Sequence, residues 1–282
     1  MSQWLLETGE YSDFMIECQG QTFKAHRAVV CPQSSIIDAL LKKDLEETQT
    51  STVHIDGFSV EAVQCLLRFI YGVPRPLNVP VNTILDPMAA SSTKEFQFKT
   101  TGQSQIQVAP TAEDDKKNRL VFLVWANAIA DSYKVQGLCK LTCDKIKSLL
   151  ENEWAPEIFL KVAQVVPIAT GDMAVHHLFA QVAAEHVEDL AKHENGLSGL
   201  LALDGFFTLF LKHSAARVAE LKKTANNQAN QAQTLSTKVM ACIKKLNDTK
   251  KCRHCAVKFD CYIETSLSTL RCAACQTRHP CT

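Results

Sequence analysis

Four cysteines near the end of the chain have the spacing of a metal site. Cys252 and Cys255 form one Cys-x2-Cys pair, Cys272 and Cys275 form a second, and sixteen residues lie between the pairs. Each pair can place two thiolates on one tetrahedral ion, and the separation leaves room for a β-hairpin. The pattern predicts a structural zinc ion in a ribbon-like module over residues 251–282, because four sulfurs leave no coordination position open for catalysis.

Other side chains of the same stretch can also bind a metal, and one of them can take the place of a member of the four. They are Cys261, His254, His279 and Cys281. We expect ordinary packing or surface roles for them. The apolar residues of the module, among them Phe259 and Leu270, make too small a core to fold without a metal ion.

The end of the chain is basic, whereas the chain as a whole is neutral. From residue 244 onward there are eight Lys or Arg and three Asp or Glu, a net charge of +5, while the whole chain has thirty of each class. A basic zinc module suits phosphate contacts, and Phe259 or Tyr262 can stack on bases. Equally basic surfaces occur on ribbons that bind proteins. Nucleic-acid binding is therefore an alternative to protein binding for this module.

The clearest fold signals lie between residues 11 and 72, where the hydrophobic spacing switches between the strand period and the helix period. Alternation over residues 14–18, a Gln19-Gly20 turn and an extended stretch over residues 21–25 predict a β-hairpin. Ser59 is placed to cap the best-defined helix of the chain. A mixed α+β unit is expected here.

Three blocks in this stretch resemble a BTB/POZ domain. They are Tyr11-Ser12-Asp13-Phe14, Phe23-Lys24-Ala25-His26-Arg27-Ala28-Val29 and Leu66-Leu67-Arg68-Phe69-Ile70-Tyr71-Gly72. A later segment, residues 130–138, is similar to the part that follows the family's last long helix. The resemblance implies a small sheet with a cluster of helices over residues 8–150, with a Pro/Ser/Thr-rich insertion at about 74–117.

The resemblance also implies two interaction surfaces. Asp13 and Arg27 match the positions of a charged pair in the family's homodimer interface, although a turn residue and an exposed cation are the simpler interpretation. Leu45 and Glu47 resemble the hydrophobic-x-Glu motif with which cullin-binding BTB proteins meet the cullin scaffold. Leu45 would enter an apolar pocket and Glu47 would pair or cap at its rim. The alternative for this triplet is a domain that only dimerises.

Helical spacing dominates the middle of the chain. Apolar clusters over residues 151–216 predict an all-α region, which is similar in position to the BACK-type region of many BTB proteins. Residues 217–250 predict a long helix with a regular heptad that alanines and a glutamine weaken. One core position holds Val218, Ala225, Ala232, Val239 and Leu246, and the other holds Leu221, Gln228, Leu235 and Cys242. This helix is either a solvated linker or one strand of a weak dimeric coiled coil.

The sequence contains no nucleophile elbow, phosphate-binding glycine loop, dinucleotide fingerprint or His-Glu-x-x-His motif. It also has no basic leader and no run of eighteen apolar residues. We therefore expect a cytoplasmic or nuclear, non-enzymatic interaction adaptor that dimerises and recruits partners, with the role of a substrate adaptor of a cullin-type ubiquitin ligase. The expected partners are a second copy of the chain, a cullin scaffold protein and a substrate or regulatory protein. A chromatin or transcription regulator is the alternative, and a metal-dependent enzyme would need a vacant position on the zinc.

Overall fold

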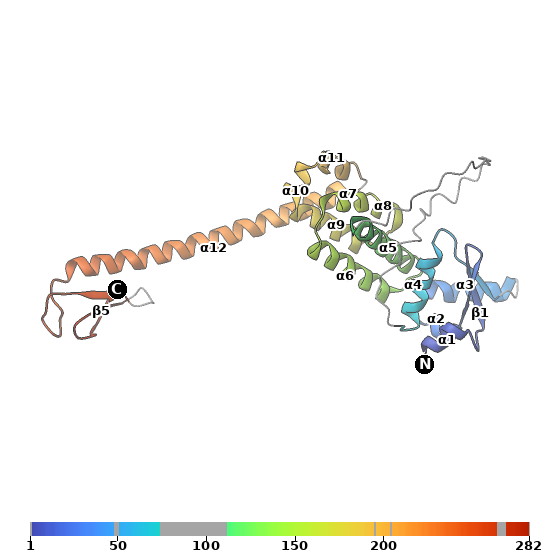
Figure 1. Ribbon diagram of the computed structural model, residues 1–282, viewed down its shortest axis with the longest axis horizontal. Helices are drawn as coiled ribbons and strands as arrows, with labels where there is room; N and C mark the ends of the chain where they lie inside the picture. The colour runs from blue at the N-terminus through green and yellow to red at the C-terminus, as the bar shows by residue number, and fades with distance from the viewer. Residues whose placement is uncertain are drawn as a thin grey trace. The chain divides into compact units, whose positions relative to one another are not determined.

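The computed structural model describes residues 2–47, 51–73, 112–194, 196–203, 205–263 and 269–281 (Figure 1). The chain divides into two compact units, Met1–Ser214 and Ala215–Thr282. In the described ranges, none of the helices is both long enough and apolar enough to span a bilayer. The predicted fold class is confirmed, because a small mixed sheet with helices is followed by a helical region and a small C-terminal sheet.

The first sheet is built around the predicted hairpin. Strands β1 (Phe14–Cys18) and β2 (Gln21–Ala25) pair antiparallel, and β3 (Thr52–His54) adds to β1 in parallel. The connecting residues Gln19 and Gly20 both have positive φ, 50° and 77°, which is the backbone of a tight two-residue hairpin turn. The side chains of β1 alternate between buried and more exposed positions, so one face of this strand faces the core.

Four helices accompany this sheet. They are α1 (Ser2–Thr8), α2 (Arg27–Val30), α3 (Ser35–Glu47) and α4 (Val60–Ile70). The Ser59 hydroxyl accepts a hydrogen bond from the Ala62 N–H and caps α4, as the sequence predicts. The Ser34 hydroxyl accepts from the Ile37 N–H at 3.2 Å, close to the start of α3.

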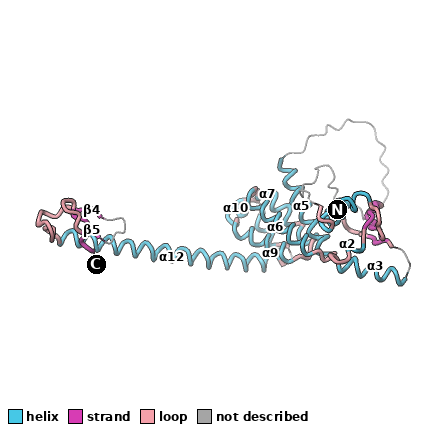
Figure 2. The backbone as a smooth tube through the Cα atoms, turned by 90° about the horizontal axis from the view of Figure 1, so that it is seen from below, coloured by secondary structure: helices cyan, strands magenta, loops and turns pink. Residues whose placement is uncertain are grey.

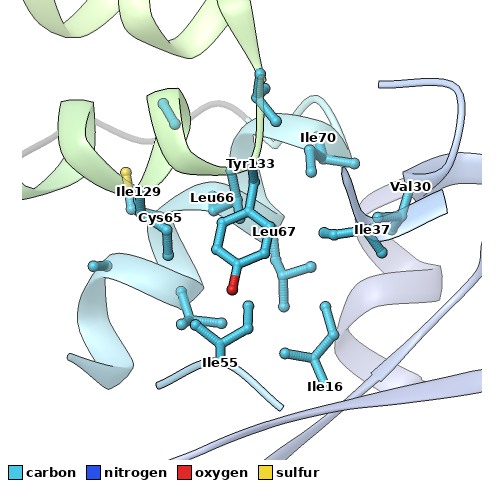
Figure 3. Packing of buried hydrophobic residues seen from close by; sticks show 14 of the residues in the cluster. Ile16, Val30, Ile37, Ile55, Cys65, Leu66, Leu67, Ile70, Ile129 and Tyr133 are labelled. Atoms are coloured by element: carbon cyan, nitrogen blue, oxygen red, sulfur yellow. The ribbon is translucent and has the colours of Figure 1, made fainter. Parts of the chain in front are cut away.

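A hydrophobic core joins the sheet to these helices and to a later helix, α5 (Ala112–Ser132). Ile16 from β1, Ile37 from α3, Leu66 from α4 and Ile129 from α5 lie in the same cluster (Figure 3). Each of these side chains is fully buried, and each such burial contributes about 1.5–3 kcal/mol to folding. A helix more than forty positions beyond α4 therefore completes the core of the first sheet.

The helices of the helical region follow α5 in the chain (Figure 2). This region has a hydrophobic core of its own. Its further elements are α6 (Gln136–Asn152), α7 (Pro156–Ala163), α8 (Val166–Ala169), α9 (Met173–Glu185), α10 (Val187–Lys192) and α11 (Gly196–Leu201). Helix α5 serves both cores, since Leu120 and Val124 pack here while Ile129 packs against the sheet unit. This explains the nearly continuous apolar run over residues 120–130, which a helix with only one buried face does not need.

Asn127 of α5 is a fully buried polar residue that ties several segments together. Its amide nitrogen lies 3.0 Å from the Asp172 carboxylate and 3.2 Å from the Thr142 hydroxyl. Its carbonyl oxygen accepts from the Thr170 hydroxyl at 2.8 Å. The network satisfies a polar group inside the core and joins α5, α6 and the segment before α9.

The long helix α12 (Phe206–Asp248) leads to the C-terminal sheet. Every residue of α12 from 215 to 238 is exposed in the single chain, and the predicted heptad positions Val218, Leu221 and Leu235 are 49%, 55% and 50% exposed. The coiled coil stays a prediction. The C-terminal sheet is antiparallel, in the order β4 (Cys261–Ile263), β5 (Thr269–Cys272), β6 (Arg278–Pro280).

The structure adds two facts to the predicted domain layout. Helix α5 begins at Ala112, inside the range assigned to the insertion, and most of residues 74–117 lies outside the described residues. Helix α12 begins at Phe206, before the predicted linker helix of residues 217–250. The domain boundaries themselves stay predictions.

Candidate metal centre and interaction surfaces

Two short turns carry the four cysteines, and the turns share one hydrogen-bond pattern. In the first, the Cys252 N–H donates to the Val257 carbonyl and the Ala256 N–H donates to the Cys252 carbonyl, both at 3.0 Å. In the second, the Gln276 N–H donates to the Cys272 carbonyl at 2.9 Å. Ala256 and Gln276 have positive φ, 58° and 61°. Each turn thus reverses the chain just after the second cysteine of its pair.

The four thiol groups come together in one cluster. The sulfur atoms of Cys252 and Cys275 are 3.6 Å apart, and those of Cys255 and Cys272 are 3.9 Å apart. All four sulfurs lie within 4.8 Å of one another. Four sulfurs at about 2.3 Å from a tetrahedral ion would be about 3.8 Å apart, whereas a disulfide would need about 2.05 Å. The cluster could hold a metal ion, and its spacing fits zinc.

The thiols of the four-cysteine cluster differ in pKa. A hydrogen bond with the Thr277 side chain, 3.2 Å from the sulfur, and a second with the Thr277 backbone lower the pKa of Cys275 to about 5. The Val257 amide lowers the pKa of Cys255, but burial and the neighbouring thiols outweigh it and raise that pKa to about 11. Adjacent thiolates repel one another, so full ionisation requires a cation. This electrostatic conflict favours metal binding.

His279, which the sequence analysis left open as a replacement ligand, lies beside the four-cysteine cluster. Its Nε2 atom is 3.5 Å from the Cys252 sulfur, its side chain is buried, and its ring contacts that of Phe259 edge-on with centroids 4.6 Å apart. The backbone amides of Cys255 and His254 lower the pKa of Cys252. An imidazole N–H beside this sulfur would further stabilise a thiolate, so His279 has the position of a supporting residue.

The remaining spare ligands lie elsewhere in the module. Cys261 on β4 pairs with Cys272 across the sheet, His254 is exposed, and Cys281 packs against Cys242 of α12. Among the described residues, the group close enough to share one ion consists of the four predicted cysteines. The Arg253 guanidinium donates a hydrogen bond to the residue 278 carbonyl at 2.8 Å and so ties the first turn to β6. No pattern in the sequence predicts this hydrogen bond.

In the N-terminal part of the chain, hydrogen bonds of Asp13 and His26 hold the connection between the β1–β2 hairpin and α2. The Asp13 carboxylate accepts a hydrogen bond from the Arg27 backbone N–H at 2.8 Å, and no ion pair of the described residues uses the Arg27 guanidinium. His26 is buried, with Nδ1 2.7 Å from the Tyr71 hydroxyl and Nε2 2.7 Å from the Glu10 carbonyl. His26 is therefore a hydrogen-bonded core residue.

The family comparison agrees with this fold. Residues 3–99 match the model of the BTB/POZ domain family.

The chain contains a BTB/POZ domain.

Several curated proteins are similar to the chain over this domain. A BTB/POZ domain-containing protein of Arabidopsis thaliana is 34% identical over 68 residues, which is 24% of this chain and 21% of that protein. Human Kelch-like protein 24 is 34% identical over 61 residues, 22% of this chain and 10% of its own length. Human Kelch-like protein 34 is 31% identical over 90 residues, or 32% and 14%. The matched stretch thus spans at most 21% of these relatives.

Leu45 and Glu47 lie in the BTB/POZ domain, in the last turn of α3. The side chains of residues 44–47 lie outside the described part of the chain. The backbone places the triplet at the C-terminal end of a helix whose earlier residues Ile37 and Leu41 are buried in the domain core. The proposed contact surface is therefore held by a packed element of the BTB/POZ domain.

Proposed function

We propose that the protein is a non-enzymatic interaction adaptor that forms a homodimer through its BTB/POZ domain and recruits a cullin scaffold and a substrate protein. The observation that carries this proposal is the presence, in one chain, of a BTB/POZ domain and a separate four-cysteine module. BTB proteins are usually non-catalytic. The function of such a chain is to bring bound proteins together.

The cullin contact rests on the end of α3. Leu45 and Glu47 lie in the last turn of α3, and the earlier residues Ile37 and Leu41 anchor this helix in the domain core. The similarity of the domain to Kelch-like proteins 24 and 34 also supports protein–protein interaction and a cullin adaptor role. In this proposal Leu45 fills an apolar pocket and Glu47 forms polar contacts at its rim.

We propose that the homodimer forms through the BTB/POZ domain, with Asp13 and Arg27 at the interface. Asp13 already binds the Arg27 backbone within one chain, which leaves the guanidinium to reach a second copy. Light scattering over a concentration series tests this proposal, with Asp13→Asn and Arg27→Gln as the variants. A dimer that both variants weaken is expected, whereas a monomer at every concentration contradicts the proposed homodimer.

The C-terminal module is proposed to be a structural zinc ribbon held by Cys252, Cys255, Cys272 and Cys275. When bound, zinc supplies a cross-link between the two turns and neutralises the thiolates. The cluster joins β5 to the segment that follows α12, and the small core around Leu270 cannot replace that cross-link. We propose that the folded module presents the second binding surface of a cytoplasmic or nuclear adaptor.

A second candidate function, nucleic-acid binding in a chromatin or transcription regulator, rests on charge. From residue 215 onward the sequence has twelve Lys or Arg and four Asp or Glu, so the C-terminal unit carries +8 and the rest of the chain −8. Tyr262 and Ile263 on β4 are each 46% exposed beside these cations. Fluorescence anisotropy with single- and double-stranded oligonucleotides at low salt tests this function, and no binding there excludes it.

A further inference from the structure

A second group of cysteines lies in the C-terminal unit, apart from the metal cluster. Cys242 of α12 and Cys281 after β6 are 1% and 9% exposed and share a small core with the fully buried Leu270. The two thiols are close enough to be hydrogen-bonded to one another. They are thirty-nine positions apart in the chain, so the fold of the module, and not their sequence spacing, brings them together.

We propose that Cys242 and Cys281 are a modification site, a thiol pair that a disulfide-type oxidant converts into a reversible cross-link between α12 and the end of the chain. A disulfide requires two cysteine side chains that point toward one another, and Cys242 and Cys281 meet in one small core. The cross-link would close a long loop and restrict the unfolded state of the module. This inference does not depend on the cullin or nucleic-acid proposals.

The chemistry can be written with oxidised glutathione as the co-reactant. One cysteine thiolate attacks the glutathione disulfide and releases one glutathione, and the second cysteine then displaces the other glutathione from the mixed disulfide. Two protein thiols lose two electrons and two protons, one S–S bond forms in the protein, and two glutathione thiols are produced. No metal takes part in this exchange.

The surroundings of the pair also set its kinetics. Burial, followed by the hydrogen bond and the proximity of Cys242, raises the pKa of Cys281 to about 11. Because the thiolate is the attacking species, exchange is slow at neutral pH and accelerates as the pH rises. Both thiols are buried, so local opening of the module is the route by which the oxidant reaches them.

A third thiol, Cys261, borders the same core, and a second metal site is the competing interpretation. Cys261 is half-buried on β4, and its pKa is raised by burial and then by the nearby Asp260. Among the described residues, these three thiols do not gather as closely as the four cysteines of the metal cluster. The contact between Cys242 and Cys281 therefore favours a two-thiol reaction over a three-ligand ion site.

The test uses the zinc-loaded full chain, incubated in glutathione redox buffers of increasing potential and then mapped by non-reducing peptide mass spectrometry. We expect a disulfide-linked pair of peptides that contain residues 242 and 281, with a mass two hydrogens below the sum of the two peptides. The oxidised chain should still contain its zinc before digestion. The cross-link should form faster at pH 8.5 than at pH 7. It should disappear after dithiothreitol treatment and never form in Cys242→Ser or Cys281→Ser.

Cys65→Ser provides the matched control, because Cys65 is also buried and burial raises its pKa to about 11 as well. The cross-link between residues 242 and 281 should persist in that variant. Zinc content reports whether each variant still folds its module, and the redox titration of the unaltered chain stands independently of any variant. The inference is overturned by a stable glutathione adduct on either cysteine, by cross-links among residues 252, 255, 272 and 275 instead, by a second zinc ion lost on Cys242→Ser, or by free thiols at every potential.

Discussion

The sulfur atoms of Cys252 and Cys275 lie 3.6 Å apart although the two residues are 23 positions apart in the chain. The pair joins the first turn of the module to the second, and Cys255 and Cys272 make the reciprocal link at 3.9 Å. This crossed arrangement places two thiols from each turn around one centre. It is the geometry that a tetrahedral metal ion would fix.

Removing one thiol of the cluster should abolish metal binding. We expect one zinc per chain in the unaltered protein and none in Cys252→Ser, because three sulfurs and a hydroxyl bind zinc far more weakly and the module has little core. Elemental analysis of the purified chain measures this directly. Cys261→Ser is the control and should keep its zinc, so loss of zinc there but not in Cys252→Ser would show that the ligand set is wrong.

The neighbouring His279 should tune the same centre without being a ligand. His279→Ala removes the imidazole 3.5 Å from the Cys252 sulfur, and we expect zinc affinity to fall by about 10–100-fold while stoichiometry stays at one. Competition with a chromophoric chelator gives the affinity. His254→Ala, an exposed histidine of the first turn, should leave it unchanged. Complete loss of zinc in His279→Ala would instead identify a ligand.

Acid should release the metal, and Thr277 should set the pH at which it does so. The lowered pKa of Cys275, from 9.0 to about 5, stabilises the folded module in full above pH 9.0, and this contribution is lost as the pH falls toward 5. Thr277→Val removes the hydroxyl and raises the pKa of Cys275, so zinc release should begin at a higher pH. A chelator assay across the acidic range measures the midpoint, with Thr269→Val as the control. An unchanged midpoint would contradict the role of Thr277.

Replacing the buried Asn127 should lower the free energy of unfolding far more than replacing an exposed asparagine. Asn127→Leu removes the amide group that Asp172, Thr170 and Thr142 share. The Thr170 hydroxyl then loses its acceptor, and an unsatisfied buried group costs about 1–3 kcal/mol. We expect the free energy of unfolding in urea to fall by about 2–4 kcal/mol. Asn152→Leu, on the exposed end of α6, should change it by less than about 0.5 kcal/mol. Equal effects would show that the network contributes little.

Local patterns in the sequence were enough for the hairpin, the Ser59 cap and the cysteine spacing. Gln19 and Gly20 provide the turn and residues 14–18 alternate, so short-range sterics and burial decide the outcome. The position of His279 beside Cys252 depends on the pairing of β5 with β6, and no local pattern encodes it. The same holds for Asn127, whose partner Asp172 is 45 positions away. Long-range contacts of single polar groups leave no periodic signal to read.

The binding of a cullin scaffold to the full chain decides whether the protein is a cullin adaptor. The purified chain is titrated with the amino-terminal domains of a panel of cullins by isothermal calorimetry, comparing the unaltered chain with Leu45→Asp and with Ile168→Asp, an exposed isoleucine of α8. We expect one cullin per protomer, a loss of about tenfold or more in affinity for Leu45→Asp, worth about 1.4 kcal/mol, and no change for Ile168→Asp. Absence of binding to every cullin, or equal affinity of Leu45→Asp and the unaltered chain, would contradict the cullin adaptor role.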